Sequence, residues 1–515
     1  MQNPQGVVIL DFGGQYTQLI ARRIREGGVY SSVLPYTATK AEILAEKPLG
    51  LILSGGAYSV LDEDAPLCDQ EIFSLGIPVL GICYGMQLMA HVLGGKVTRG
   101  QPREYGRTQV WMDKRDAGLL EGLSEQSECW MSHTWQVSGL PSGFEIIAHT
   151  EACPIAAMAN ETERLYGVQF HPEVTHTEEG RKLLETFLKD ICAIPGGWNM
   201  EAYAELAVRQ IQEQVGDTGT VLLGLSGGVD SAVTAALLYR AIGDRLTCVF
   251  VDHGFMRKAE CDQVKEVFSG TFPVKLVHVD ASDLFFTDLA GVTDPETKRK
   301  IIGRDFVEVF KEEARKLGKL DHFAQGTIYP DVIESGKVKG SAVIKSHHNV
   351  GGLPEELGFT SLVEPLRSLF KDEVRLLGVA LGLPKSLVYR QPFPGPGLAV
   401  RVVGDLTREK VAVVRESDAI LREEIEKAGL NNEISQYFTV LTGARSVGVM
   451  GDERTYAHAI AIRAVITDDF MTADVAQIPY DILGRIATRI VGEVAEVNRV
   501  LYDITTKPPA SIEWE

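Results

Sequence analysis

The chain of 515 residues carries 70 acidic and 51 basic side chains, which give a formal net charge of −19 at pH 7. A field of that sign repels phosphate backbones, so general nucleic-acid binding is not expected. Hydrophobic residues make up 45% and charged residues 23% of the chain, which is typical of a globular α/β enzyme rather than of a disordered or fibrous protein.

The sequence carries no pattern of export or membrane insertion. The opening stretch MQNPQGVVILDFGG has no basic segment followed by a long apolar run, and no later stretch reaches the roughly 18 apolar residues of a membrane span. Seven cysteines are scattered without the paired spacing of a zinc site. We therefore expect a cytoplasmic protein with reduced thiols and no membrane contact.

Residues 1–195 alternate short β-type runs with helical patterns. The β-type runs are GVVILDF, GLILSGG, IPVLGIC and LYGVQFH, and the helical patterns cover 15–27 and 85–93. This alternation predicts a largely parallel sheet flanked by helices. The proline and glycines of AIPGGWN, at 193–199, then predict a linker.

Strand and helix patterns restart in residues 196–390 and predict a second α/β sheet. Its strands are expected at TVLLGLSG, LTCVFVDHG, VKLVHVD and HFAQGTIY. The polar stretch YPDVIESGKVKGSAVIKSHHNVGGLP is too long for a tight turn, and long loops of this kind are typical of lids.

A second boundary is predicted at 389–401, where YRQPFPGPGLAVR packs prolines and glycines together. Residues 391–515 combine helical patterns at 408–428 and 479–501 with strands near YFTVLTGARSVGVMG and YAHAIAIRAVI. They predict a smaller α+β domain.

The segment GICYGMQ places Cys83 between glycines, after an apolar strand and before a helix. Glycines on both sides permit a sharp turn that projects the thiol, and the helix N-terminus favours its thiolate. A lone cysteine is usually only a small buried residue, so the importance of Cys83 depends on this context.

A thiolate nucleophile needs a base, and YGVQFHPE supplies His171 at a strand end. Glu173, two positions on, lies on the same side of an extended chain and would orient the imidazole as the third member of a triad. The run LILSGGAYSV ends another strand in a double glycine, so the backbone N–H groups of Gly56 and Tyr84 would form an oxyanion hole.

Together these segments resemble the class I glutamine amidotransferase family over nearly all of residues 6–190. The resemblance implies that Cys83 attacks the side-chain amide of glutamine, that ammonia leaves, and that water releases glutamate from the thioester. The chain departs from the family at Ala57, where proline is common, and at SHTW (132–135), which replaces SHGD.

The segment LLGLSGGVDSAV, residues 222–233, predicts a strand that runs into a glycine turn and then a helix. Its N–H groups, hydroxyls and helix N-terminus form a nest for phosphate, although an isolated SGG is usually only a helix cap. A Walker A loop would carry a lysine that is missing here, so ordinary γ-phosphate transfer is not favoured. The loop residues are Ser226, Gly227, Gly228, Val229, Asp230 and Ser231.

The full S-G-G-x-D-S pattern resembles the N-type ATP pyrophosphatase family, with adenine-nucleotide α-hydrolase-like sheets. The resemblance implies attack on the α-phosphate of ATP with pyrophosphate as the leaving group. Asp230 would then help to hold Mg²⁺ near the phosphates, because hard cations prefer carboxylate and phosphate oxygens.

The segments GTIYPDVIES, KSHHNVGGLP, QPFPGPGLAVR and KPPASIEWE resemble the glutamine-hydrolysing GMP synthase family, and the match covers essentially the whole chain. The resemblance implies a ligase of purine biosynthesis that adenylates the C2 oxygen of XMP and replaces it with ammonia from glutamine. It implies an amidotransferase domain at 1–195, a pyrophosphatase domain at 196–390, and a C-terminal domain at 391–515 that forms a homodimer.

The same resemblance assigns further residues. XMP contacts are expected from Arg299, Gln477, Lys507 and Glu513. Residues of the lid are expected to close over the adenylation site, because an adenylated intermediate hydrolyses when water enters. These lid residues are Asp331, Glu334, Lys345, His347 and His348.

Two alternatives stay open. A pyrophosphatase-type tRNA-modifying enzyme shares S-G-G-x-D-S, but it would need a basic surface, which the charge of −19 disfavours. A regulatory protein that binds nucleotide and glutamine without turnover would have no need of a thiol elbow.

Overall fold

The computed structural model describes residues 5–115, 118–318, 320–335, 358–450, 453–467 and 472–515. The chain divides into two units, Met1–Ala202 and Tyr203–Glu515. Within the described ranges, no helix is both long and apolar enough to cross a membrane.

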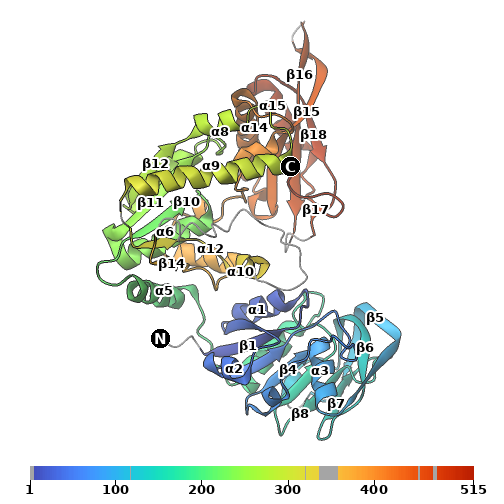
Figure 1. Ribbon diagram of the computed structural model, residues 1–515. Helices are drawn as coiled ribbons and strands as arrows, with labels where there is room; N and C mark the ends of the chain where they lie inside the picture. Colours follow the sequence, from blue (N-terminus) through green and yellow to red (C-terminus); the bar gives the residue numbers. More distant parts are fainter. Residues whose placement is uncertain (1–4, 116–117, 319, 336–357, 451–452, 468–471) are drawn as a thin grey trace. The chain divides into compact units, whose positions relative to one another are not determined.

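The first unit, drawn in blue to green in Figure 1, is built on a nine-stranded sheet. The order of its strands is β2-β1-β3-β4-β9-β8-β7-β5-β6. From β2 to β9 all neighbours are parallel, and this half contains the strands that the sequence predicts. The sheet continues with antiparallel strands that the sequence analysis did not predict. The strands are β1 (Gly6–Asp11), β2 (Tyr30–Pro35), β3 (Gly50–Leu53), β4 (Val79–Ile82), β5 (Lys96–Met112), β6 (Gln126–Gly139), β7 (Glu145–His149), β8 (Ala157–Asn160) and β9 (Leu165–Val168).

Two helices of this unit confirm the predicted patterns at 15–27 and 85–93. Helix α1 (Thr17–Glu26) packs on β2, and α3 (Tyr84–Val92) packs on β4 and β9. The buried side chains of α1 recur every three or four positions, as expected of an amphipathic helix. The other helical segments are α2 (Lys40–Ala45), α4 (Gly180–Glu185), η1 (Gln70–Ser74), η2 (Gly118–Leu120) and η3 (Thr186–Ile191).

The second unit starts with a five-stranded parallel sheet in the order β12-β11-β10-β13-β14. Its central strands are apolar and buried, as is typical of parallel strands covered on both faces. The strands are β10 (Val221–Leu225), β11 (Leu246–Asp252), β12 (Lys275–Asp280), β13 (His322–Ala324) and β14 (Ser361–Val363). The helical segments are α5 (Met200–Val215), α6 (Val229–Ile242), η4 (Gly243–Arg245), α7 (Glu260–Glu266), η5 (Val267–Thr271), α8 (Ser282–Asp288), α9 (Pro295–Lys316), α10 (Tyr329–Ser335), α12 (Lys371–Ala380), α13 (Lys385–Val388) and η6 (Gly397–Arg401).

The expected lid-like loop begins as a helix, which corrects the sequence analysis. Its first residues form α10 (Tyr329–Ser335). The carboxylate of Asp331 accepts a hydrogen bond of 3.1 Å from the backbone N–H of Ile328 and so stabilises the turn that starts this helix. Residues 336–357 lie outside the described ranges.

A four-stranded sheet completes the second unit, with β18 parallel to β16. Helix α14 (Arg408–Lys427) packs against β15, and α15 (Tyr480–Glu493) packs against α14 and β18. The sheet consists of β15 (Gln436–Met450), β16 (Glu453–Ile466), β17 (Asp474–Val475) and β18 (Val497–Asp503), with η7 (Leu430–Asn432) before it.

The helix predicted at 479–501 is wrong in its second part. Helix α15 ends before Val494, Glu496 has a positive φ of 69°, and the chain then enters β18. Pairing with β16 and burial of Val497 decide the conformation here, so tertiary contacts override the local helical pattern.

One hydrophobic core joins both sheets of the second unit. It contains Leu222 and Val249 from the first sheet and Ile460 and Ile486 from the C-terminal part. Residues on both sides of the expected boundary at 390/391 therefore share a core, and the division into 1–195, 196–390 and 391–515 stays a prediction.

Candidate active sites

Cys83 lies in a strained turn between β4 and α3. Its φ of 53° and ψ of −105° are unusual for a residue with a side chain. A Cβ at Gly81 would lie 2.6 Å from the carbonyl carbon of Gly85, and one at Gly85 would lie 2.3 Å from the carbonyl oxygen of Leu53. Close backbone packing therefore requires both glycines of the G-x-C-x-G motif.

His171 and Glu173 meet beside this turn. The Nδ1 atom of His171 lies 2.7 Å from Oε1 of Glu173. A Cβ built on Gly55 would lie 3.3 Å from Cε1 of His171 and 3.9 Å from Cβ of Cys83, so this glycine fits against both side chains. The exposed fractions of Cys83, His171 and Glu173 are 5%, 4% and 1%.

The environment of His171 favours its protonated form. Burial by itself would lower the pKa of His171, but the Glu173 carboxylate and the Cys83 sulfur beside the ring raise it well above its usual value. An imidazole that holds a proton next to a sulfur atom suits a thiolate–imidazolium pair.

The two residues predicted for the oxyanion hole also lie together. Tyr84 is the first residue of α3, and a Cβ at Gly56 would lie 3.1 Å from the Tyr84 ring. The Tyr84 hydroxyl donates a hydrogen bond of 2.9 Å to the carbonyl of Pro66, which holds the ring in place.

Two buried glutamines next to Cys83 were not singled out from the sequence. Gln169 Nε2 lies 3.6 Å from the Cys83 sulfur, and Gln87 Nε2 lies 3.2 Å from Oε1 of Gln169. Gln87 lies in GICYGMQ, one helical turn after Cys83, and Gln169 lies in YGVQFHPE, two residues before His171. These positions within the motifs were the feature by which the sequence could have identified both glutamines.

In the second unit, the S-G-G-x-D-S loop connects β10 to α6 as predicted. Gly227 has a positive φ of 73°, and Gly228 is the residue before the first turn of α6. The hydroxyls of Ser226 and Ser231 share a hydrogen bond of 3.2 Å, and Ser231 also donates to the carbonyl of Gly228 at 3.0 Å. Val229 is buried and starts the helix, so the loop turns its polar groups to one end of α6.

Asp230 has a cationic partner that the sequence analysis missed. Nζ of Lys371 lies 2.8 and 2.6 Å from the two carboxylate oxygens of Asp230. A Cβ at Gly326, in the loop after β13, would lie 3.1 Å from the Asp230 carbonyl carbon. The first residue of α12 and the loop after β13 therefore meet the phosphate-type loop.

The lid residues are described only in part. The Asp331 side chain is engaged at the start of α10, as given above. The Glu334 side chain, Lys345, His347 and His348 lie outside the described part of the chain.

The C-terminal tail is docked rather than frayed. Glu513 accepts hydrogen bonds from Arg401 at 2.9 and 3.2 Å and from Gln436 at 2.9 Å. Lys298 and Arg299, at the start of α9, contact the side chain and the carbonyl of Glu515, respectively.

Two further residues, Lys507 and Gln477, are predicted to bind XMP. The backbone of Lys507 forms a bridge with that of Ala473, with N–O distances of 2.8 and 2.9 Å. Gln477 is exposed and follows β17. The structure thus brings Arg299 to Glu515 and Lys507 to the β17 segment, whereas no contact ties Gln477 to Glu513 among the described residues.

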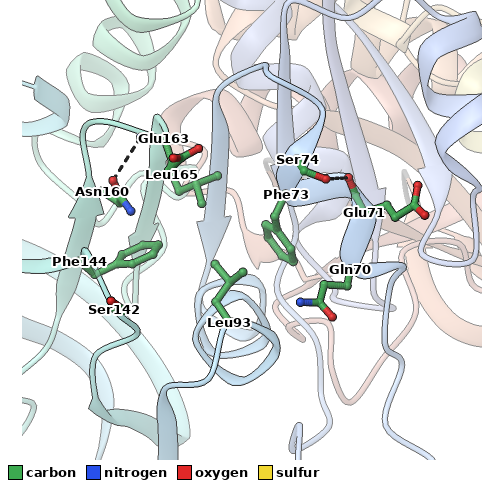
Figure 2. Close-up of a pocket in the computed structure, with 10 residues that line it drawn as sticks. All are labelled: Gln70, Glu71, Phe73, Ser74, Leu93, Ser142, Phe144, Asn160, Glu163 and Leu165. Carbon is green, nitrogen blue, oxygen red and sulfur yellow. Dashed lines mark hydrogen bonds between the residues drawn. The ribbon is translucent and has the colours of Figure 1, made fainter.

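A pocket of about 500 Å³ lies elsewhere in the first unit (Figure 2). Leu165 is the first residue of β9, whereas Cys83 follows the last residue of the parallel strand β4. The pocket therefore lies where these strands begin, at the end of the sheet opposite Cys83. Among the residues that the structure describes, no predicted site residue lines it. The lining residues are Gln70, Glu71, Phe73, Ser74, Leu93, Ser142, Phe144, Asn160, Glu163 and Leu165.

Three family models match successive parts of the chain. The family model "Glutamine amidotransferase class-I" matches residues 8–191, "NAD synthase" matches 202–298, and "GMP synthase C terminal domain" matches 423–514. A GMP synthase (glutamine-hydrolyzing) of Acetivibrio thermocellus is 59% identical over 513 residues, which are 100% of both chains. One of Clostridium tetani is 57% identical over 509 residues, or 99% of both chains. The chain therefore belongs to the GMP synthase (glutamine-hydrolyzing) family.

Proposed function

We propose that this chain is a glutamine-dependent ligase that converts XMP to GMP. It hydrolyses glutamine to glutamate and ammonia, transfers the adenylyl group of ATP to the C2 oxygen of XMP, and replaces that oxygen with ammonia. The observation that best supports this function is that a chain of this family has a strained cysteine turn beside a His–Glu pair in one unit and a phosphate-type loop at a helix N-terminus in the other.

In the first unit, the Cys83 thiolate attacks the amide carbon of glutamine. The carbon–nitrogen bond breaks, ammonia leaves with a proton supplied by His171, and water then cleaves the thioester. Glu173 holds the imidazole through Nδ1, so that Nε2 faces the reacting atoms. The N–H groups of Gly56 and Tyr84 are proposed to bind the oxyanion.

In the second unit, residues 226–231 are proposed to bind the ATP phosphates. The XMP C2 oxygen bonds to the α-phosphorus and pyrophosphate leaves; ammonia then bonds to C2 and AMP leaves. Asp230 offers a carboxylate, the donor type that Mg²⁺ prefers alongside phosphate oxygens, and the ion would neutralise phosphate charge. Lys371, which holds that carboxylate in the structure, would then be available to the phosphates.

The adenylation site is proposed to be completed by the lid and the C-terminal tail. The lid residues are Asp331, Glu334, Lys345, His347 and His348, and the XMP contacts are Arg299, Gln477, Lys507 and Glu513. Docking of the tail through Arg401 and Gln436 supports this placement of Glu513.

We also propose a cytoplasmic homodimer that associates through residues 391–515. Three apolar side chains of the β15–β16 hairpin support an interface there, because Val447, Val449 and Tyr456 are 54%, 76% and 65% exposed.

The test is the product set, measured by mass spectrometry after incubation with Mg-ATP, XMP and either glutamine or ammonium. We expect GMP, AMP and pyrophosphate with both nitrogen donors. The Cys83→Ala variant is expected to lose at least ~100-fold of the glutamine-dependent rate while it retains the ammonium-dependent rate, since only the nucleophile is removed.

The matched control is Cys129→Ala, which removes another buried thiol of the first unit and is expected to keep both rates. Formation of ADP and phosphate would contradict the proposed ATP chemistry. Loss of both rates in Cys83→Ala would instead assign Cys83 a structural role.

A further inference from the structure

A chain of buried side-chain amides leads from a backbone carbonyl to the Cys83 sulfur. Nε2 of Gln87 donates to the carbonyl oxygen of Trp135 at 2.7 Å and to Oε1 of Gln169 at 3.2 Å. Nε2 of Gln169 lies 3.6 Å from the Cys83 sulfur. Gln87 and Gln169 are 3% and 0% exposed, so water does not compete for these bonds.

The direction of this chain is fixed by its first member. The Trp135 carbonyl can only accept, so the NH₂ group of Gln87 must face it. The second hydrogen of that group then faces Gln169, whose carbonyl oxygen must accept it. Turning either amide around would set two donors or two acceptors against each other. The NH₂ group of Gln169 is therefore the end that faces Cys83.

The Trp135 carbonyl is itself held from the other side. His133 Nδ1 lies 3.1 Å from it, and His133 Nε2 lies 3.1 Å from Oε2 of Glu104. Thr150 donates to the other carboxylate oxygen at 2.7 Å. Cys153 lies beside this group, close enough for a metal to join it to His133 and Glu104, but its sulfur already donates to a backbone carbonyl at 3.4 Å. The cluster thus acts as the anchor of the hydrogen-bond chain.

We propose that Gln169 is a positioning residue of the glutaminase site, whose side-chain amide donates a hydrogen bond to the Cys83 sulfur and favours its thiolate form. The inference rests on the proposed function, in which Cys83 is the nucleophile. The thiol points toward the carbonyl of Ser132 at 3.8 Å, which repels a thiolate. The Gln169 donor offsets that repulsion.

Gln169 is distinct in effect from the triad. His171 accepts and donates a proton during the reaction. The side-chain amide of Gln169 does not ionise at neutral pH, so Gln169 affects the reaction only through its hydrogen bond to the sulfur. The titratable groups near the sulfur are His171, with Glu173 behind it, and Cys153. Burial raises the pKa of Cys153 to about 12, so this neighbour stays neutral throughout the range of the test below.

The test measures alkylation of Cys83 by iodoacetamide as a function of pH, with the Cys83 peptide quantified by mass spectrometry in the full chain. Gln169→Glu turns an acceptor toward the sulfur, and Gln169→Met removes the donor without adding charge. In both variants the pH midpoint of alkylation is expected to rise by about one unit, because the thiolate loses a charge-assisted hydrogen bond. The kcat for glutamine hydrolysis is expected to fall about tenfold, with KM for glutamine changed by less than about twofold.

The control is Gln136→Glu, the same chemical change on β6, where the amide donates a long bond of 3.5 Å to the Ala152 carbonyl. Its alkylation midpoint is expected to stay at the value of the unaltered protein. Thermal unfolding of each variant shows whether the first unit is folded, and Gln169→Met decides the question if Gln169→Glu does not fold.

An unchanged midpoint in folded Gln169→Met would overturn the proposal, even if kcat fell. The outcome for Cys83→Ala is separate: retained glutamine-dependent synthesis in that variant would refute the nucleophile, whereas the alkylation profile judges the hydrogen bond to the sulfur directly.

Discussion

His253 is a buried residue of the second unit whose pKa is lowered in the folded state. Its Nδ1 atom accepts a hydrogen bond of 3.0 Å from the backbone N–H of Phe255, and the rings of Phe255 and Phe285 lie 5.3 and 5.8 Å away. Burial lowers the pKa of His253 to about 4. The neighbouring charges of Asp252 and Glu260 oppose this shift without cancelling it.

The folded state therefore binds fewer protons at His253 than the unfolded state. The stability from this residue is complete above pH 6.5 and is lost as the pH falls toward 4, by about 3 kcal/mol. In the His253→Asn variant, whose amide oxygen replaces Nδ1, the urea midpoint of the second unit should depend less on pH across that range. Parallel pH profiles for both proteins, measured by circular dichroism, would contradict this assignment.

At this same scale, short motifs carried most of the predictive power. Cys83, His171 and Glu173 stand in motifs whose local geometry brings a thiol, a ring and a carboxylate within reach, and the structure places them together. Lys371 could not be found in this way, because it lies 141 positions from Asp230 and meets it only through the packing of α12 beside α6.

Among the structural elements, the turn from β4 into α3 depends most directly on its glycines. A Cβ at Gly85 would lie 2.3 Å from the Leu53 carbonyl oxygen and 2.7 Å from the Leu53 Cβ, so the turn or β3 must move. Gly85→Ala should displace Cys83 and lower glutamine-dependent synthesis at least ~10-fold, because a small misplacement of a nucleophile is costly. Ammonium-dependent synthesis, measured in the same preparation, should persist.

The control for this substitution is Gly303→Ala in α9, where a Cβ meets no atom within 4 Å. It should keep both activities and raise stability slightly, because alanine is the better helix former. Equal glutamine-dependent rates for Gly85→Ala and the unaltered protein would show that the turn tolerates a side chain.

Elements with a simple period were predicted and those shaped by distant pairing were not. Helix α1 buries a residue every three or four positions, as its apolar repeat predicts, whereas α3 is buried along most of its length. The segment after α15 has an apolar pattern that suits a helix. It nevertheless forms the strand β18, because its backbone pairs in parallel with β16. Burial along the long strand β5 follows no regular period, so it offers no clear strand pattern to detect. In β6, buried positions alternate from Ser127 to His133, as in a half-buried strand, and the sequence analysis missed this pattern.

For the molecule as a whole, composition and the break at 193–199 indicated separate α/β regions, and the structure divides near that break, at Ala202. The sequence could not show that residues on both sides of the expected boundary at 390/391 share a hydrophobic core. Three buried charged residues also come together there from distant segments, because Asp418 lies 3.7 Å from Arg257 and 3.6 Å from Arg401 and all three are nearly inaccessible to solvent.

The tail that closes the second unit is fastened by a buried ion pair. Nζ of Lys298 is bonded to the Glu515 carboxylate and, at 2.8 Å, to the Val402 carbonyl, and its side chain is 0% exposed. The other carboxylate oxygen of Glu515 accepts from the Gly404 N–H at 3.1 Å. Figure 1 shows the C-terminal end beside α9, the helix that carries Lys298.

Removing the Glu515 carboxylate should therefore release the tail that carries Glu513. Glu515→Ala leaves the Lys298 charge buried without its partner, which costs about 3 kcal/mol of stability in the second unit. We expect KM for XMP to rise at least ~10-fold with ammonium as the nitrogen donor, because Glu513 loses its position. The double variant Lys298→Met, Glu515→Leu removes both charges and should recover most of the stability and part of the XMP affinity. Urea unfolding and XMP saturation curves measure both effects, and an unchanged KM in Glu515→Ala would show that Arg401 and Gln436 alone hold Glu513 in place.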